Sequence, residues 1–161
     1  MSHPNVQRVI AAGEALGIVV SPKSFPEGTK TAADAAAAIG CSVGQIVKSL
    51  IFGVEHGDDT EIVLAYVSGE NQLDERKLAV AAGALECRRV DADAVRTATG
   101  FPIGGVPPFG HTTELRTFVD PDLLGHDEVW AAAGTWHDVF PLAPAELVRA
   151  TGAQVTDLRR A

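Results

Sequence analysis

The chain has few cysteines and no cluster of metal-ligating residues. Its 161 residues include two cysteines, Cys41 and Cys87, and neither has a second thiol two or three positions away. This excludes a disulfide framework and a four-cysteine zinc site. The five histidines are scattered without the spacing of a ligand set: His3, His56, His111, His126 and His137. We therefore expect inert thiols, no metal, no cofactor and a reducing compartment, the cytoplasm.

The motifs of several common enzyme classes are also missing. The sequence contains no Gly-x-Ser-x-Gly elbow, no Gly-x-x-x-x-Gly-Lys loop and no His-Glu-x-x-His helix, which argues against the usual serine hydrolases, nucleotide hydrolases and zinc proteases. The N-terminus has no basic segment followed by an apolar run, so no secretory signal is expected. The longest uncharged stretch, residues 97–113, contains four glycines and three prolines. Such a segment would not form a membrane-spanning helix.

The chain has fewer positively charged than negatively charged residues. The chain has 13 Lys and Arg against 21 Asp and Glu, a net charge of −8. This balance argues against a binder of duplex DNA or of membrane surfaces, since neutralising many phosphates needs an excess of cations. Any contact with nucleic acid must be local. With 46% hydrophobic residues, the chain can bury a core as one domain over residues 1–161.

Hydrophobic spacing and turn residues predict a mixed α/β fold. Helices are expected at 4–16, 31–39, 74–82, 91–100 and 144–151, and strands at 18–20, 45–52, 61–67, 85–90, 116–119, 128–133, 138–142 and 154–158. Thr31, Asp74 and Asp91 are expected to cap helices, and the strands 45–52 and 61–67 to pair as a hairpin. Because strands and helices do not alternate strictly, a mixed sheet packed by helices is favoured over a doubly wound parallel one.

Lys48 interrupts the otherwise apolar strand 45–52. Strand alternation places its side chain on the face shared by Ile46, Leu50 and Phe52. The lysine then either extends its ammonium group out of the core face or lines a pocket. Taken alone, the first reading is the commoner one for a lysine.

The segment Gly100–Gly110 combines rigid and permissive backbone. Its prolines fix φ, and its glycines leave backbone N–H and C=O groups open to a ligand. Such a loop can hold a small polar group without offering a nucleophile. A purely structural turn explains the composition equally well.

Four segments taken together resemble a known family: Thr31–Ala36, Gln45–Leu50, Thr99–Gly110, and Ala132–Thr135 before a Leu-x-x-x-Glu-Leu helix. In this order and spacing they resemble the YbaK/prolyl-tRNA-synthetase-associated editing domain family over nearly the whole chain. The resemblance implies a curved, barrel-like mixed sheet that is packed by helices and encloses a pocket. It also implies an enzyme that hydrolyses, in trans, the ester of a wrongly charged aminoacyl-tRNA.

The resemblance also implies site residues. The family's pocket lysine falls on Lys48 as the catalytic residue, and its Gly-x-x-x-Pro loop falls on Gly104–Pro108. The expected substrate-binding residues are Phe25, Lys30, Thr31, Gly104, Gly105, Val106, Pro108, Gly134 and Thr135. The partner implied is the acceptor end of an aminoacyl-tRNA, with no metal and no cofactor. Because an acidic chain should bind free tRNA weakly, an aminoacyl-tRNA synthetase that recruits the protein is a second expected partner.

Substrate size is expected to be set by Ile103, Val106 and Phe109 near the loop. A small amino acid such as Ser, Thr or Ala on tRNA for proline or a related tRNA is therefore favoured. Family members that act on cysteinyl-tRNA commonly have Ser-Pro where this chain has Pro107-Pro108, which makes cysteine the second choice. Two other functions stay open: a catalytically inactive tRNA- or nucleotide-binding module of the same fold, and an esterase unrelated to translation.

Overall fold

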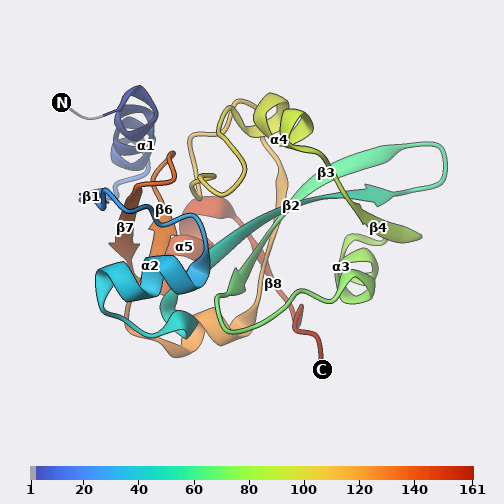
Figure 1. The fold of residues 1–161 in the computed structure, drawn as a ribbon. Coiled ribbons are helices and arrows are strands. Elements are labelled where there is room, and N and C mark those ends of the chain that lie inside the picture. Colours follow the sequence, from blue (N-terminus) through green and yellow to red (C-terminus); the bar gives the residue numbers. More distant parts are fainter. Residues whose placement is uncertain (1–2) are drawn as a thin grey trace.

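A computed structural model describes residues 3–161 and shows a mixed α/β fold (Figure 1). The α-helices in these residues are α1 Pro4–Ala15, α2 Ala32–Ile39, α3 Glu75–Ala82, α4 Ala92–Thr99 and α5 Pro144–Thr151, with short 3-10 helices η1 Val43–Gln45 and η2 Pro121–Gly125. The strands are β1 Lys23–Ser24, β2 Val47–Glu55, β3 Thr60–Ser68, β4 Glu86–Arg89, β5 Arg116–Val119, β6 Val129–Ala132, β7 Asp138–Leu142 and β8 Gln154–Val155. The predicted fold class is confirmed.

The helices begin where the sequence predicts their caps. The Thr31 hydroxyl accepts a hydrogen bond from the Asp34 amide at 3.1 Å. The carboxylates of Asp74 and Asp91 accept from amides of the first turns of α3 and α4. Each of these contacts satisfies an amide that has no partner within its helix.

The larger sheet has five strands in the order β4-β2-β3-β5-β8. Strands β2 and β3 form the predicted antiparallel hairpin, in which Lys48 lies opposite Val67. The β3–β5 and β5–β8 pairs are parallel, so the sheet is mixed as predicted. The smaller sheet is antiparallel, in the order β1-β7-β6.

The barrel-like closure implied by the family resemblance is wrong, because the two sheets do not close on each other. Between β2 and β6 they meet at one isolated bridge, Ile46 with Trp130. Beyond that bridge the two strands diverge, and α2 packs over the junction through Ala35 and Ala36. The sheets therefore leave a gap along one edge of β2.

Two predicted strands differ from the structure. Residues 18–20 form no strand, although Ile18 and Val20 are buried and Val19 is 84% exposed. The alternation of buried and exposed side chains in this segment arises because the segment packs against the core, although no neighbouring strand pairs with it. The last strand is shorter than predicted, since β8 ends at Val155 and Leu158 reaches the core from an irregular segment.

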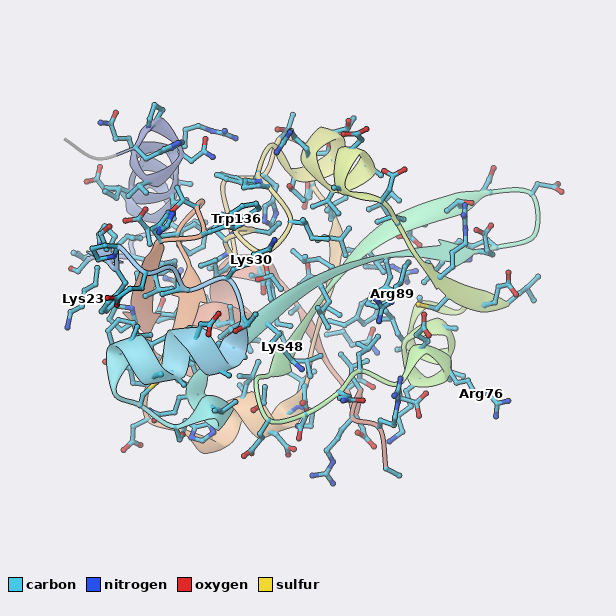
Figure 2. The ribbon with its side chains drawn as sticks, viewed as in Figure 1. Lys23, Lys30, Lys48, Arg76, Arg89 and Trp136 are labelled. Carbon is cyan, nitrogen blue, oxygen red and sulfur yellow. The ribbon has the colours of Figure 1, made fainter. Side chains whose placement is uncertain are left out.

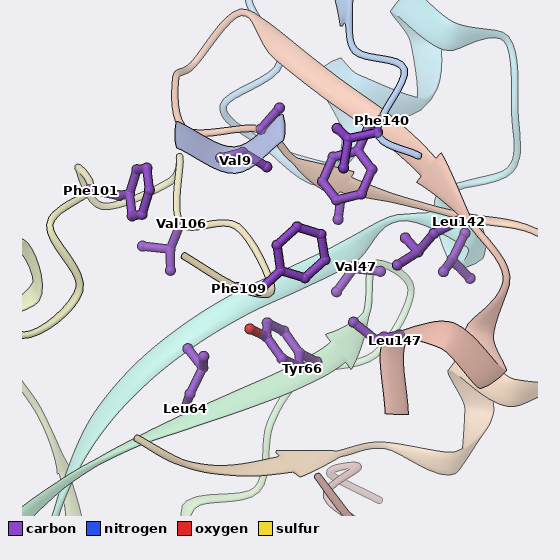
Figure 3. Close-up of a cluster of buried hydrophobic side chains, with 14 of the residues drawn as sticks. Val9, Val47, Leu64, Tyr66, Phe101, Val106, Phe109, Phe140, Leu142 and Leu147 are labelled. Atoms are coloured by element: carbon purple, nitrogen blue, oxygen red, sulfur yellow. The ribbon is translucent and has the colours of Figure 1, made fainter. Parts of the chain in front are cut away.

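The five-stranded sheet is covered on both faces. On one face, Phe52 and Val63 pack with Leu78 of α3. The other face carries the larger cluster (Figure 3), where side chains of β2 and β3 meet α1, α5, the loop 101–109 and the smaller sheet. Strand β4 pairs with β2 only over Phe52–Glu55, so the same edge of β2 is free over Val47–Ile51 within residues 3–161. Because β2 is held between two apolar layers, this free edge is a rigid support for a site.

Candidate functional site

A cavity of about 330 Å³ lies in the gap between the two sheets. It is lined by the start of α2 and the residues before it, by the free edge of β2, by the loop 103–104 and by the smaller sheet: Thr29, Lys30, Thr31, Ala32, Ala35, Ile46, Val47, Lys48, Ser49, Leu50, Ile103, Gly104, Trp130, Ala132 and Val139. The volume is at the small end of the range for ligand sites, and the walls are mostly apolar. The cavity thus suits a small group with few polar contacts.

Lys48 brings the positive charge to this cavity. Its side chain is half-buried on the same face of β2 as Leu50 and Phe52, as strand alternation predicts. The ammonium group donates a hydrogen bond to the backbone carbonyl of Asn71. Burial lowers the pKa of Lys48, and the negative charge of Asp120 acts in the opposite direction. The pocket-lining reading of this lysine is therefore the one that the structure supports.

Behind Lys48 lies a buried carboxylate that sequence analysis missed. Asp120 is 1% exposed and follows the end of β5. The Asn71 side-chain amide donates to Asp120 at 2.7 Å and to Asp122 at 2.8 Å. Asn71 therefore binds Lys48 through its carbonyl and the carboxylates through its amide. The arrangement holds the ammonium in place and supplies a countercharge.

We expect the Asp120→Asn substitution to shift the pH dependence of any activity that needs the Lys48 ammonium. Without the Asp120 charge the pKa of Lys48 falls further, so as the pH rises the activity should be lost at a lower pH than in the wild type. The measurement is a pH–rate profile corrected for the enzyme-free rate. The matched control is Asp122→Asn, which removes a carboxylate that also accepts from Asn71 but pairs with Arg159 at 3.1 Å. Equal profiles for the two variants would contradict this role of Asp120.

One rim of the cavity is formed by three loops that contact one another. Lys30 lies over the Trp136 ring, 4.0 Å from its centroid, and the indole N–H of Trp136 donates to the Ile103 carbonyl at 2.7 Å. Gly104 has φ +83°, and a Cβ there would lie 3.1 Å from Cγ of Lys30 and 3.3 Å from Nε1 of Trp136. Figure 2 shows Lys30 next to Trp136 above Lys48. Trp136 is 40% exposed at this rim.

The predicted site residues divide into two groups. Lys48, Lys30, Thr31 and Gly104 line the cavity. The others do not: Phe25, Gly105, Val106, Pro108, Gly134 and Thr135. Val106 is in the larger core cluster and Pro108 lines a separate hollow beside α5. Gly105 packs against the backbone of Thr135, and the Gly134 carbonyl accepts from the Asn5 side chain, so these residues stand behind the cavity wall.

Two further residues of the cavity could not be recognised as site residues from the sequence. The Ser49 hydroxyl is a buried side-chain group without a hydrogen-bond partner in residues 3–161, and Ser49 lines the cavity beside Lys48. An unpartnered buried hydroxyl is costly to retain unless a ligand or water uses it. Trp130 forms part of the opposite wall and is buried. Neither role could be inferred without knowing that β6 faces β2.

Within residues 3–161, no group of three or more His, Cys, Asp or Glu is placed to hold a metal ion. Burial raises the pKa of the Cys87 thiol to about 12 and also raises that of Cys41, which disfavours the reactive thiolate. In the same part of the chain, none of the helices is both long and apolar enough to cross a membrane.

The aminoacyl-tRNA editing domain profile matches residues 26–150. The chain belongs to this family. The family's members hydrolyse the aminoacyl-tRNA ester bond, so the predicted family and enzyme class are confirmed, and with them the trans-editing deacylase activity at the level of the family.

Relatives of known sequence or structure cover most of the chain. YwhH of Bacillus subtilis is 31% identical over 123 residues, 76% of each chain. The Escherichia coli multifunctional Ser/Thr-tRNA deacylase ProXp-y is 29% identical over 122 residues, 75% of this chain and 73% of the relative. A crystal structure proposed to be a trans-editing enzyme for prolyl-tRNA synthetase is 44% identical, covers 100% of both chains and superposes with a TM-score of 0.91.

Proposed function

We propose that this editing domain removes a small, wrongly attached amino acid from tRNA in trans, with the aminoacyl group bound in the cavity beside Lys48. The observation that carries the proposal is a half-buried ammonium at the wall of a small apolar cavity. The similarity to ProXp-y and to the proposed prolyl-tRNA synthetase editing enzyme supports it. The proposed substrate is tRNA for proline or a related tRNA.

The proposed reaction is attack of water on the ester carbonyl. The water oxygen bonds to the carbonyl carbon, the carbonyl oxygen becomes an oxyanion, and the Lys48 ammonium stabilises that negative charge. When the ester bond breaks, the ribose oxygen takes a proton originating from the attacking water. The products are the free amino acid and a tRNA with an intact terminal hydroxyl. Because the ester is already activated, positioning in a rigid cavity supplies much of the rate.

The cavity offers no obvious protein nucleophile, which fits a water mechanism. The Thr31 hydroxyl accepts from the Asp34 amide as a helix cap, and no histidine lines the cavity. No histidine or carboxylate that could activate the buried Ser49 hydroxyl lines the cavity, and strand alternation directs the Lys48 and Ser49 side chains to opposite faces of β2. We propose that Ser49 instead hydrogen-bonds the substrate or the attacking water.

The residues proposed to limit substrate size differ from those expected from the sequence. Of Ile103, Val106 and Phe109, only Ile103 lines the cavity, whereas the other two are buried in the core. The size limit is proposed to come from apolar residues on facing walls of the gap: Ile46, Leu50, Ile103, Trp130 and Val139. These apolar side chains have little that would distinguish a hydroxyl group from a methyl group on the bound amino acid.

A panel of mischarged tRNAs tests the proposed function. We expect hydrolysis of Ala-, Ser- and Thr-tRNA at rates that differ by about 10- to 200-fold at most, since one methylene or hydroxyl in an apolar pocket is worth about 1–3 kcal/mol. Cys-tRNA should follow, and Phe-tRNA should react at the enzyme-free rate. The measurement is the deacylation rate at fixed salt, with each amino acid on tRNA for proline and on a second tRNA.

Three outcomes would contradict parts of this proposal. Equal rates for Phe- and Ser-tRNA would exclude a size limit. Equal rates for the two tRNAs would exclude the proposed preference for tRNA for proline. Tight binding of every member without hydrolysis would favour the inactive binding module.

A further inference from the structure

A second hollow opens directly beside the cavity. It has a volume of about 470 Å³ and shares with the cavity Lys48, Ser49, Leu50 and Ile103. Its remaining lining residues come from β2, from the segment around the start of α3, from the end of β4 and from the C-terminal segment: Ile51, Phe52, Gln72, Leu73, Glu75, Arg89, Val90 and Arg160. The two hollows are therefore adjacent, and Lys48 lies on the wall that they share.

The hollow exists because β4 covers only part of the edge of β2. Pairing with β4 starts at Phe52, opposite Arg89, and continues to Glu55. In residues 3–161, no strand pairs with this edge over Val47–Ile51, and both hollows open along it. Lys48 and Phe52 are four residues apart on one face, which places Arg89 about 13 Å along the strand from Lys48. An extended ligand that leaves the cavity at Lys48 would pass this arginine.

Several of the cations that form no direct ion pair lie around these two hollows. All 13 Lys and Arg lie in the described part of the chain, and five of them form ion pairs with Asp or Glu there: Lys77, Arg88, Arg116, Arg149 and Arg159. Of the other eight, four line the hollows: Lys30, Lys48, Arg89 and Arg160. In a chain with a net charge of −8, half of the cations that form no direct ion pair thus line these two hollows, where they would attract an anion.

The two arginines of the second hollow are placed differently. Arg160 is held across it, since its guanidinium donates to the Gln72 side chain at 3.0 Å. Arg89 is exposed at the end of β4. In Figure 2, Lys48 lies below Lys30 and Arg89, and Arg76 lies further out on α3. Glu75 is the acidic residue among the lining residues, so the cationic groups outnumber it.

We propose that the second hollow binds the phosphates of the single-stranded nucleotides that precede the terminal adenosine of tRNA. This inference rests on the proposed function, which places the ester at Lys48. A strand that leaves the ester along the free edge of β2 brings its backbone phosphates to Arg89 and Arg160. Local binding of this kind also explains how an acidic protein binds RNA: a few cations contact the single-stranded end, and the rest of the surface contributes none.

The test is direct binding of uncharged RNA, which does not depend on deacylation. The probe is a fluorescein-labelled RNA hairpin that carries the tRNA acceptor stem with its single-stranded ACCA end, and the comparison probe is the same hairpin without that overhang. We expect Arg89→Ala to weaken binding of the overhang probe about tenfold, as for loss of a charge-assisted contact. The slope of log affinity against log salt concentration should decrease by the amount expected for the loss of about one phosphate contact. Glu75→Gln should strengthen binding of the overhang probe. Neither substitution should change the affinity for the hairpin without the overhang.

The matched control is Arg96→Ala, which removes an exposed arginine of α4 that has no ion pair in residues 3–161 and lines neither hollow. If Arg96→Ala weakens binding as much as Arg89→Ala, or if the blunt hairpin loses the same affinity, the proposal is overturned. With an aminoacylated overhang hairpin, Arg89→Ala should raise KM and leave kcat unchanged. A wild-type protein that binds the overhang through Arg89 but hydrolyses no aminoacyl-tRNA would refute the proposed function and leave the binding groove standing.

Discussion

Replacing Lys48 with alanine or methionine is expected to slow deacylation of a small aminoacyl-tRNA strongly, to a rate that stays above the enzyme-free rate. Lys48 and Lys30 are the two cations that line the cavity, and Lys48 is the one proposed to stabilise the oxyanion. Removing a charge that stabilises a developing oxyanion in a low-dielectric site costs about 10²–10³ in kcat. Methionine keeps most of the apolar stem beside Leu50 while removing the charge and the hydrogen bond to Asn71. The measurement is single-turnover deacylation, with the fold checked by circular dichroism and thermal unfolding.

The stability of these variants is part of the same prediction. Asp120 is almost fully buried and faces Lys48 as a countercharge, so loss of the ammonium should lower the free energy of unfolding by about 1–3 kcal/mol. The control is Lys77→Ala, which removes a lysine of α3 that pairs with Asp157 at 2.7 Å on the surface. It should leave deacylation unchanged. A folded Lys48→Met protein with wild-type deacylation would exclude Lys48 as the catalytic residue.

The parts of the fold predicted correctly are those encoded by neighbouring residues. The caps Thr31, Asp74 and Asp91 are recognisable because a side chain and an amide two or three positions apart decide where the helix begins. The β2–β3 hairpin is recognisable because its strands alternate on either side of one turn. Strand alternation also gave Lys48 its correct face. For these elements the local pattern and the tertiary structure agree.

The cavity could not be predicted in the same way, because its walls come from distant segments. The sequence gives no indication that β6 meets β2 at one bridge and then diverges, and this divergence creates the cavity. Asp120 and Asn71 are far from Lys48 along the chain, and their types alone do not show that they meet. The segment 18–20 shows the opposite case. Its alternation of buried and exposed residues predicts a strand, but no strand forms because no partner strand lies beside it.

The loop Gly104–Pro108 illustrates how a correct local pattern can leave the role of each residue undecided. Its composition predicts rigid backbone, and the structure buries Gly105 through Pro108. Only Gly104 of this segment lines the cavity. A Cβ at Gly105 would lie 3.2 Å from two backbone atoms of Thr135, so a valine there would push the loop away from its support before it could fill the cavity. The test of the loop therefore belongs at Gly104.

A Gly104→Ala substitution should lower kcat/KM of deacylation more than tenfold, with a smaller effect on the fold. An L-residue at a positive φ costs about 1–2 kcal/mol, and the new methyl group would press on Lys30 and Trp136. Both effects move the rim of the cavity, and misplacement of a site by about 1 Å can cost on the order of 10²-fold in rate. The measurements are kcat/KM and the free energy of unfolding.

The matched control for that variant is Gly57→Ala in the turn between β2 and β3. Gly57 also has a positive φ, +99°, but a Cβ there would have no atom within 4 Å. Gly57→Ala therefore introduces the backbone strain without the contact and lies at the far end of the hairpin from Lys48 (Figure 1). We expect the two variants to lose similar stability and only Gly104→Ala to lose deacylation. If both variants keep wild-type kcat/KM, the loop serves only as a connection between α4 and β5, and substrate positioning must come from the β2 edge and α2.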